Sequence, residues 1–291
     1  MIKTPHTLER DIIHVLNTGE GWTDRISEWV ADDIAKSLSR QFGGRGDTNR
    51  GLRLSSLGTE CERKLWFSVN WRIEPEPIPP FTYSKFIFGD ITESYVLGLC
   101  KAAGHSVEGM QTPLDLLGIR GHRDCVIDGM LFDVKSASTY SFQNFTKKGV
   151  RNSDGYGYVS QLSSYLFASR NDPLLEHKKH AGFIFFDKQF GDIVVRILDL
   201  SKELDKKEEE VERKKQLVDQ PEPPEREYEP VYLAAGSKYN PQLPTNPCGY
   251  CQHKMECWGD LHVYEHREKG NRLYFTEVNK ELREETWHRI T

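Results

Sequence analysis

The sequence predicts an α/β fold, because patterns typical of strands and patterns typical of helices follow one another through the middle of the chain. Residues 114–136 alternate between apolar and polar side chains, and two apolar runs at 182–187 and 192–200 read as further strands. Helical patterns precede and separate them, at 84–103 and 157–170. We therefore expect the core to lie within residues 81–200.

The composition narrows the class of protein. With 291 residues, 37% hydrophobic and 29% charged, the chain can build a sizeable core. It contains no run of 18 apolar residues and begins without an apolar leader, so we expect a cytoplasmic protein with no membrane partner. The net charge of −5 is not the basic footprint of a DNA-coating protein, but carboxylates in a cation-binding site would contribute to it.

The region before this core, residues 1–80, is expected to be mainly helical. Residues 1–50 are charged and end in a glycine-rich loop at 43–46, and an aromatic-rich segment follows at 52–72. The proline-rich run 74–80 reads as a linker. The helix at 84–103 is closed by Gly104.

A hairpin is expected within 114–136. Asp-Gly at 128–129 lies between two alternating runs, which is the strongest short-range signal for a two-residue turn. Such a turn places Ile127 opposite Met130. Counting outward, Asp124 then lies opposite Asp133.

The hairpin register predicts a cation site. Opposed carboxylates at Asp124 and Asp133 repel each other unless a cation lies between them, and oxygen ligands suit Mg²⁺ or Mn²⁺. Lys135 shares their face because alternate residues of a strand point the same way, and the same count places His122 opposite it. An ammonium there can stabilise charge that develops on a phosphate. The alternative is an exposed polar strand face.

Two helices contribute further candidates. Glu93 has mostly apolar neighbours at helical spacing, so it lies on a packing face and needs a partner, a metal or a route to water. Gln161 and Tyr165 are four residues apart and project together. They can bind phosphate or hold the lysine, or they belong to an ordinary amphipathic helix.

The C-terminal region, 201–291, opens with a charged helix at 201–218 whose simplest reading is a solvated face. Favourable charge pairs four residues apart are expected at Glu203/Lys207, Glu209/Arg213 and Glu210/Lys214. Prolines at 221–225 end this helix, and the tail from 259 contains one strand-like run at 272–278.

The cysteines predict a metal group. Cys248, Cys251 and Cys257 lie within ten residues, and Cys61 is a distant fourth candidate. Clustered thiols in a cytosolic chain suit zinc or a [4Fe–4S] cluster, and the spacing leaves both open. Cys100 and Cys125 lie in expected core elements and read as buried thiols.

Aromatic side chains at Trp66, Phe67 and Trp71 lie near two basic residues, Arg63 and Lys64. They either stack on nucleic-acid bases or pack around the cysteine group. The chain contains no G-x4-G-K-[ST] motif, so it does not drive unwinding by ATP and would act on single strands or frayed ends.

An ordered set of motifs over residues 52–258 resembles a known family. The motifs are S-S-L-G-T-E-C-E-R-K-L-W-F, G-D-I-T-E, G-H-R-D, D-V-K, Q-L-S-S-Y and C-x2-C-x5-C. The chain is similar to the RecB-like PD-(D/E)XK nucleases of the iron–sulfur branch. This branch includes CRISPR-associated RecB-like exonucleases and the nuclease domain of AddB-type helicase–nucleases.

The resemblance implies a restriction-endonuclease-like core, in which helices flank a mixed sheet, with a C-terminal iron–sulfur staple. It assigns the metal to Glu93, Asp124 and Asp133 with the Val134 carbonyl, and catalysis to these carboxylates with Lys135. The Q-x3-Y motif, Gln161 and Tyr165, would support the site and the DNA. The cluster ligands would be Cys61, Cys248, Cys251 and Cys257. Many relatives carry a histidine where this chain has Thr92, and His122 would compensate from the sheet.

We therefore expect a Mg²⁺- or Mn²⁺-dependent DNA exonuclease that acts on single-stranded DNA or free ends, in recombination, repair or DNA degradation. The alternative is a non-catalytic iron–sulfur subunit that binds DNA within a recombination or CRISPR adaptation complex. An intact D-x-K with its opposed carboxylate favours the enzyme.

Overall fold

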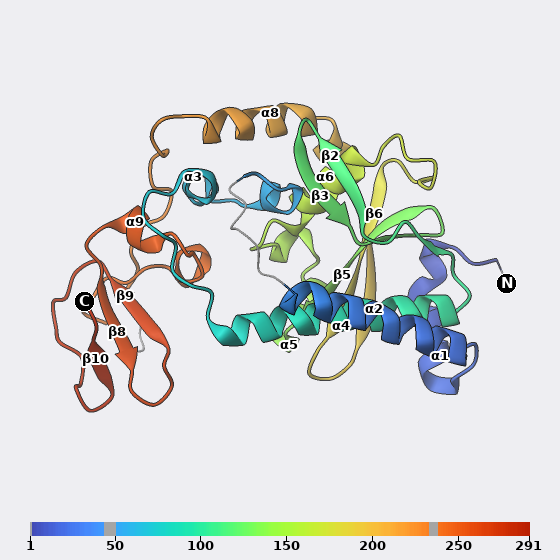
Figure 1. Ribbon diagram of the computed structural model, residues 1–291, viewed down its shortest axis with the longest axis horizontal. Helices are drawn as coiled ribbons and strands as arrows, with labels where there is room; N and C mark the ends of the chain where they lie inside the picture. Colours follow the sequence, from blue (N-terminus) through green and yellow to red (C-terminus); the bar gives the residue numbers. More distant parts are fainter. Residues whose placement is uncertain (1, 44–50, 233–237) are drawn as a thin grey trace. The chain divides into compact units, whose positions relative to one another are not determined.

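The computed structural model describes residues 2–43, 51–232 and 238–291. The chain forms two compact units (Figure 1). The sheet unit comprises Met1–Gly58 and Pro79–Arg213, and the cysteine unit comprises Thr59–Ile78 and Lys214–Thr291. These units differ from the three consecutive regions expected from the sequence, because residues 59–78 group with the C-terminal segment. The expected loop at 43–46 lies, apart from Gly43, outside the described residues.

The sheet unit is an α/β structure built on a mixed five-stranded sheet, in the order β1-β4-β5-β6-β7. Strands β5 and β6 are parallel, and the other neighbours are antiparallel. The strand bounds are β1 Val107–Glu108, β4 Cys125–Ile127, β5 Met130–Ala137, β6 His180–Asp187 and β7 Ile193–Asp199. A separate ribbon pairs β2 (Thr112–Leu116) with β3 (Ile119–Arg123).

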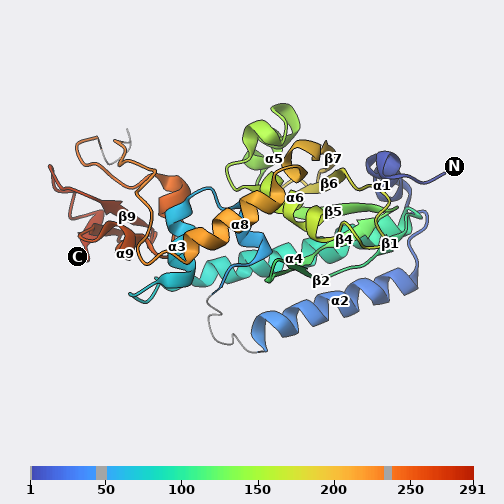
Figure 2. The same ribbon diagram turned by 90° about the horizontal axis from the view of Figure 1, so that it is seen from above.

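Helices cover both faces of this sheet, which confirms the expected mixed sheet flanked by helices (Figure 2). One core layer joins Phe132, Val134 and Ile184 to α1 (Leu8–Thr18) and α4 (Pro80–Ala102), with α2 (Asp24–Phe42) outside. The other layer joins Leu131 and Phe183 to α5 (Thr139–Lys147) and α6 (Tyr158–Ala168). Neighbouring residues of β5 enter opposite layers because side chains alternate along a strand. The short helices of this unit are η1 Pro5–Thr7, η2 Leu54–Gly58 and η3 Arg151–Ser153.

Most expected elements are present, with two corrections. Helix α4 begins at Pro80, inside the expected linker, because proline at the first helical position has a suitable φ and lacks only an N–H that would be unpaired there. The charged helix 201–218 is divided into α7 (Ser201–Leu204) and α8 (Lys207–Val218). It is not simply solvated, since Lys207 and Val211 are fully buried.

The Glu203 and Lys207 side chains, which were expected to pair with each other, each have another ion-pair partner. The Glu203 carboxylate pairs with Arg151. The buried Lys207 ammonium donates to the Glu210 carboxylate, at 2.6 Å, and to the Ser160 carbonyl of α6, at 3.3 Å. A buried ammonium requires such partners, because an unpaired buried charge costs free energy.

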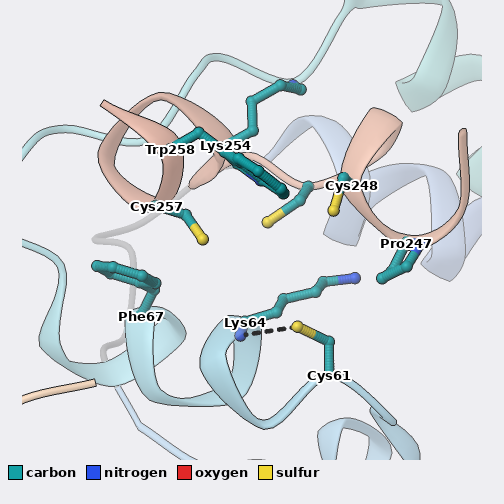
Figure 3. Close-up of a pocket in the computed structure, with 9 residues that line it drawn as sticks. Cys61, Lys64, Phe67, Pro247, Cys248, Lys254, Cys257 and Trp258 are labelled. Atoms are coloured by element: carbon teal, nitrogen blue, oxygen red, sulfur yellow. Dashed lines mark hydrogen bonds between the residues drawn. The ribbon is translucent and has the colours of Figure 1, made fainter. Parts of the chain in front are cut away.

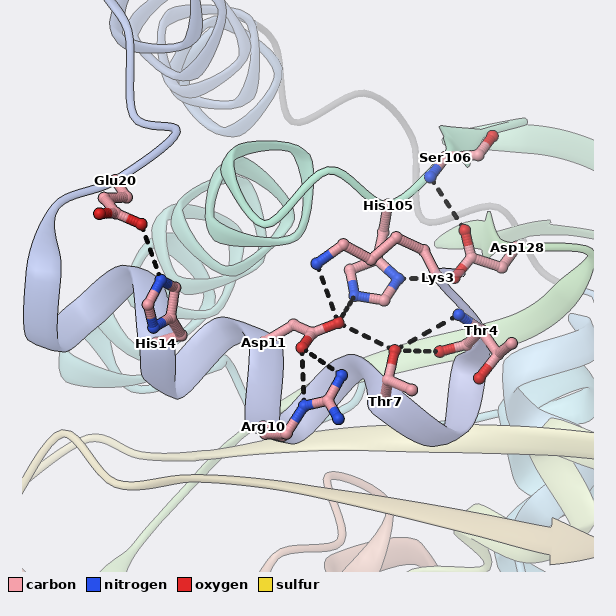
Figure 4. A network of polar contacts seen from close by, with 10 residues as sticks. All are labelled: Lys3, Thr4, Thr7, Arg10, Asp11, His14, Glu20, His105, Ser106 and Asp128. Carbon is pink, nitrogen blue, oxygen red and sulfur yellow. Dashed lines mark hydrogen bonds and ion pairs between the residues drawn. The ribbon is translucent and has the colours of Figure 1, made fainter. Parts of the chain in front are cut away.

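A buried carboxylate, Asp11, anchors α1 (Figure 4). It pairs with Lys3 at 3.0 Å and with Arg10 at 2.8 Å, and His105 Nε2 lies 3.3 Å from it. The other ring nitrogen of His105 lies 2.6 Å from Asp128, in the β4–β5 turn. Burial acts to raise the pKa of Asp11, but hydrogen bonds from Lys3 and Arg10 prevail and hold that pKa well below its ordinary value.

The cysteine unit has a small core, with Leu243, Cys248, Leu261 and Val263 at its centre. Its helices are α3 Glu62–Asn70, η4 Thr245–Gly249 and α9 Lys254–Trp258. Its sheet has the order β10-β8-β9, formed by Trp287–Arg289, His262–His266 and Arg272–Phe275. The sequence predicted only the strand at 272–278. No described helix of the chain is both long and apolar enough to cross a membrane.

Candidate active site and cysteine cavity

The β4–β5 hairpin positions the first carboxylates of the candidate site. Its turn is formed by Asp128 and Gly129, both with positive φ (47° and 76°), as a two-residue hairpin turn requires. Ile127 pairs with Met130, so the expected register is confirmed. The ladder ends at Cys125. The residue before it, Asp124, accepts a hydrogen bond from the Val134 amide at 3.0 Å.

The expected place of His122 is wrong. His122 pairs with Pro113 in the β2–β3 ribbon, and its side chain is exposed. The chain leaves the β4–β5 ladder at Asp124, so the residue count from the turn no longer holds beyond that point. The ribbon therefore carries His122 away from the strand that holds Lys135.

The D-x-K run carries an internal ion pair. Asp133 is 2% exposed, and its Oδ2 lies 2.7 Å from Lys135 Nζ. Burial acts to lower the pKa of Lys135, but the charges of Asp133 and Asp124 prevail and raise it. Lys135 therefore stays an ammonium at neutral pH.

Helix α4 brings a third carboxylate to the same place. Glu93 Oε1 accepts a hydrogen bond from Gln111 Nε2 at 2.8 Å. Burial, together with the charge of Asp133, raises the pKa of Glu93 to about 7. Burial and the charges of Asp133 and Glu93 also raise the pKa of Asp124 well above its ordinary value. The three carboxylates expected from the sequence are thus near enough to repel one another.

Helix α6 completes the arrangement from the other layer. Lys135 Nζ donates to Gln161 Oε1 at 3.4 Å, and Gln161 Nε2 donates to the Tyr165 hydroxyl at 2.9 Å. The structure therefore joins Asp133, Lys135, Gln161 and Tyr165 in one polar chain. Burial raises the pKa of Tyr165 to about 12, so its hydroxyl keeps its proton.

Two neighbours of the site were not found from the sequence. The Lys135 ammonium lies over the Tyr158 ring, 4.8 Å from its centroid, and Gln111 holds Glu93. Tyr158 precedes Gln161 by three residues on α6, and that spacing was a signal that could have found it. Gln111 follows the β1 strand in an irregular segment and has no sequence signal.

The oxygen donors fit a magnesium or manganese ion in type. As the side chains lie, no group of three His, Cys, Asp or Glu residues among those described converges closely enough to hold an ion. As the side chains lie, Asp133 is paired with the Lys135 ammonium.

The four expected cluster ligands line one small cavity of about 20 Å³ in the cysteine unit. The cavity is formed by Cys61, Cys248, Cys251 and Cys257 with Lys64, Phe67 and Trp258 among its other walls. Figure 3 shows the sulfur atoms of Cys61, Cys248 and Cys257 directed into this space. Cys61 caps α3 and accepts from the Lys64 amide at 3.3 Å. Four thiols around one cavity fit zinc or an iron–sulfur cluster in donor type.

Burial decides between base stacking and packing for Trp66 and Phe67. Trp66 and Phe67 are 2% and 3% exposed, and the Trp66 indole donates to the Gln220 carbonyl. They pack in the cysteine unit, so base stacking by these two residues is wrong. Burial raises the pKa of the Cys248 thiol to about 11, and it also raises the pKa values of the Cys61 and Cys251 thiols.

Comparisons with known proteins are sparse. No family model and no curated protein matches the chain. Among solved structures, the chain is similar to SSO0001, with 14% sequence identity and a TM-score of 0.41. That match covers 80% of this chain and 96% of SSO0001.

Proposed function

We propose that this chain is a metal-dependent DNA exonuclease of the PD-(D/E)XK kind, acting on single-stranded DNA or free ends. The observation that carries the proposal is the Lys135 ammonium held 2.7 Å from the buried Asp133 carboxylate, with two further carboxylates near enough to repel Asp133. Glu93, Asp124 and Asp133 come from a helix and a hairpin, and each affects the ionisation of another. Lys135 lies at the same place.

Without a bound cation, the charged forms of these carboxylates are destabilised. Repulsion and burial raise the pKa of both Glu93 and Asp124, which means that their charged forms are destabilised. A divalent cation would remove that cost, and Glu93, Asp124 and Asp133, with the Val134 carbonyl, are the residues that would hold it. When bound, Mg²⁺ or Mn²⁺ would activate water and offset phosphate charge.

The remaining residues position one positive charge. Asp133 and Gln161 hold the Lys135 ammonium from two elements, and Tyr165 holds the Gln161 amide in turn. An ammonium that is fixed in this way can stabilise the negative charge that develops as a phosphodiester is hydrolysed. The polar contacts that link Tyr165, Gln161, Lys135 and Asp133 therefore fix the orientation of the Lys135 ammonium.

The cysteine cavity supports a structural iron–sulfur cluster as the second part of the proposal. Cys61 is distant in sequence from Cys248, Cys251 and Cys257, yet all four line one cavity. A group bound by all four would join the two segments that form this unit, residues 59–78 and 214–291. This role requires no redox step.

The test is hydrolysis of single-stranded DNA labelled separately at each end, with Mg²⁺ or Mn²⁺. Wild type would be compared with Lys135→Ala and with Lys36→Ala, a matched change at an exposed lysine of α2. We expect Lys135→Ala to lower the rate by about 100-fold or more. We expect Lys36→Ala to cleave as wild type does.

Failure of cleavage by both wild type and Lys36→Ala, with DNA binding retained, would contradict the enzyme. The cluster-bearing, non-catalytic DNA-binding subunit would then be the better account. Circular dichroism of each variant shows whether it is folded, so that loss of activity is not confused with loss of structure.

A further inference from the structure

A pair of stacked tyrosines extends outward from the lysine of the candidate site. The Tyr158 ring lies under the Lys135 ammonium, and the Tyr156 ring stacks on Tyr158 with centroids 5.4 Å apart and planes 26° apart. Tyr156 is 56% exposed. The outer end of the stack is therefore open to solvent, while its inner end contacts a residue of the proposed active site.

Core packing explains Tyr158 but not Tyr156. The centroid of the Tyr158 ring lies 6.1 Å from that of Phe145 and 6.3 Å from that of Phe183. Both phenylalanines belong to the core layer that includes α5 and α6. Tyr156 has no comparable burial. An exposed aromatic ring, separated by one stacked ring from a candidate catalytic group, suits a planar ligand.

The backbone beneath the two rings is held in place. Between them, Gly157 has φ of +73°, and a Cβ there would overlap the carbonyl oxygen of Gly58. The Asp154 carboxylate accepts from the amides of Tyr158 and Val159, at 2.7 and 2.8 Å, and so caps α6. The stack is preorganised, which lowers the ordering cost of binding.

Positive charge lies close in sequence to this surface. The α5 helix, whose Phe145 contacts Tyr158, ends in Lys147 and is followed by Lys148, both exposed. In grooves that bind single-stranded nucleic acid, phosphates pair with lysines while bases stack on aromatic rings.

We propose that Tyr156 and Tyr158 form a stacking platform for an unpaired nucleobase next to the phosphodiester at Lys135. The choice of DNA as ligand rests on the proposed function. A paired base is already stacked on both faces within a duplex, so the platform selects single-stranded DNA. Stacking tolerates any base, because every base has an aromatic face, and the platform therefore confers no sequence preference.

The experiment measures binding without cleavage. A fluorescein-labelled oligothymidylate and an abasic oligonucleotide of equal length are titrated with the full chain in EDTA. The variants are Tyr156→Ala, Tyr156→Phe and, as a matched exposed tyrosine elsewhere, Tyr232→Ala, which is 63% exposed in wild type. We expect Tyr156→Ala to weaken oligothymidylate binding by about tenfold or more. Tyr156→Phe, Tyr232→Ala and wild type should bind alike.

The abasic probe makes the test specific. Tyr156→Ala and wild type should bind it equally, because it offers no base to stack. Equal binding of oligothymidylate by Tyr156→Ala and wild type would overturn the platform, as would an equal loss on both probes. If wild type cleaves DNA and the platform test fails, only the platform is wrong. A base-dependent loss without any cleavage would overturn only the nuclease, and no DNA binding by wild type would overturn both.

Discussion

Lys135 Nζ lies 2.7 Å from Asp133 Oδ2, so the lysine of the D-x-K run is held by the carboxylate two residues before it. The pair is the consequence of strand geometry, since alternate side chains of β5 point to the same face. Gln161 contacts the same ammonium from α6. The lysine is therefore oriented by both a strand and a helix before any ligand binds.

Loss of the Gln161 amide should lower the cleavage rate more than loss of the Tyr165 hydroxyl. Gln161→Leu removes the group that contacts Lys135, and we expect it to lower kcat on single-stranded DNA by about 10- to 100-fold. Tyr165→Phe leaves Gln161 Oε1 in place and should have a smaller effect. Steady-state cleavage and binding in EDTA measure both effects. Equal losses of kcat in the two variants would contradict a series of hydrogen bonds in which Gln161 contacts Lys135 and Tyr165 acts through Gln161.

The four cysteines that line the cavity should bind iron, and the two core cysteines should not. Cys251→Ser should lower the iron content and the brown colour of the purified protein and weaken the cysteine unit against proteolysis, because its core is small. Cys100→Ala, in the core of the sheet unit, is the matched control and should keep its iron. If the purified wild-type protein is colourless and contains stoichiometric zinc, the iron–sulfur prediction is wrong and the cysteines bind zinc.

Asp11 should stabilise the fold in a pH-dependent manner. Its pKa in the folded state lies below the ordinary 3.8, so its contribution is present above that pH and is lost as the pH falls through the lower folded value. At pH 7, Asp11→Asn should lower the free energy of unfolding by about 2 kcal/mol, and the difference should shrink below pH 4.

Urea denaturation at several pH values measures this effect. Glu20→Gln is the control, since the pair between Glu20 and His14 is exposed and should contribute at most about 1 kcal/mol. If the loss of unfolding free energy in Asp11→Asn stays constant down to pH 3, the charge of Asp11 is not what stabilises α1.

The close approach of two glycines should make Gly157 intolerant of a side chain. Gly157→Ala places a Cβ against the Gly58 carbonyl and should cost about 3 kcal/mol or more. Gly118→Ala, at a similar φ of +84° with open space around it, should cost only the backbone strain of about 1–2 kcal/mol. Thermal unfolding compares the two, and equal losses would mean that φ alone decides.

Sequence patterns predicted those parts of the site that depend on local geometry. Asp-Gly at 128–129 predicted the turn, and the two-residue period predicted that Asp133 and Lys135 share a face. The four-residue spacing of Gln161 and Tyr165 predicted their contact. In each case the two residues are neighbours along one element, so sequence distance and spatial distance agree.

Contacts between elements followed different rules. His122 was misplaced because the chain enters a second ribbon at Asp124, and pairing with β2 decides where its side chain points. Lys207 was expected to be solvated, but it is fully buried, and its ammonium donates to the Ser160 carbonyl of α6. Burial of a charge depends on what lies across the interface, which a charge pattern on one helix does not contain.

By itself, the sequence determined the strands between residues 112 and 199, the hairpin register, the shared face of Asp133 and Lys135 and the candidate ligands. These follow from periods of two and 3.6 residues and from donor chemistry. Only the tertiary structure decided that Gln111 holds Glu93, that Trp66 and Phe67 are buried, and that Tyr156 is exposed over Tyr158. Those outcomes depend on packing between segments distant in sequence, where the free energy of burial selects among faces that local propensity leaves equivalent.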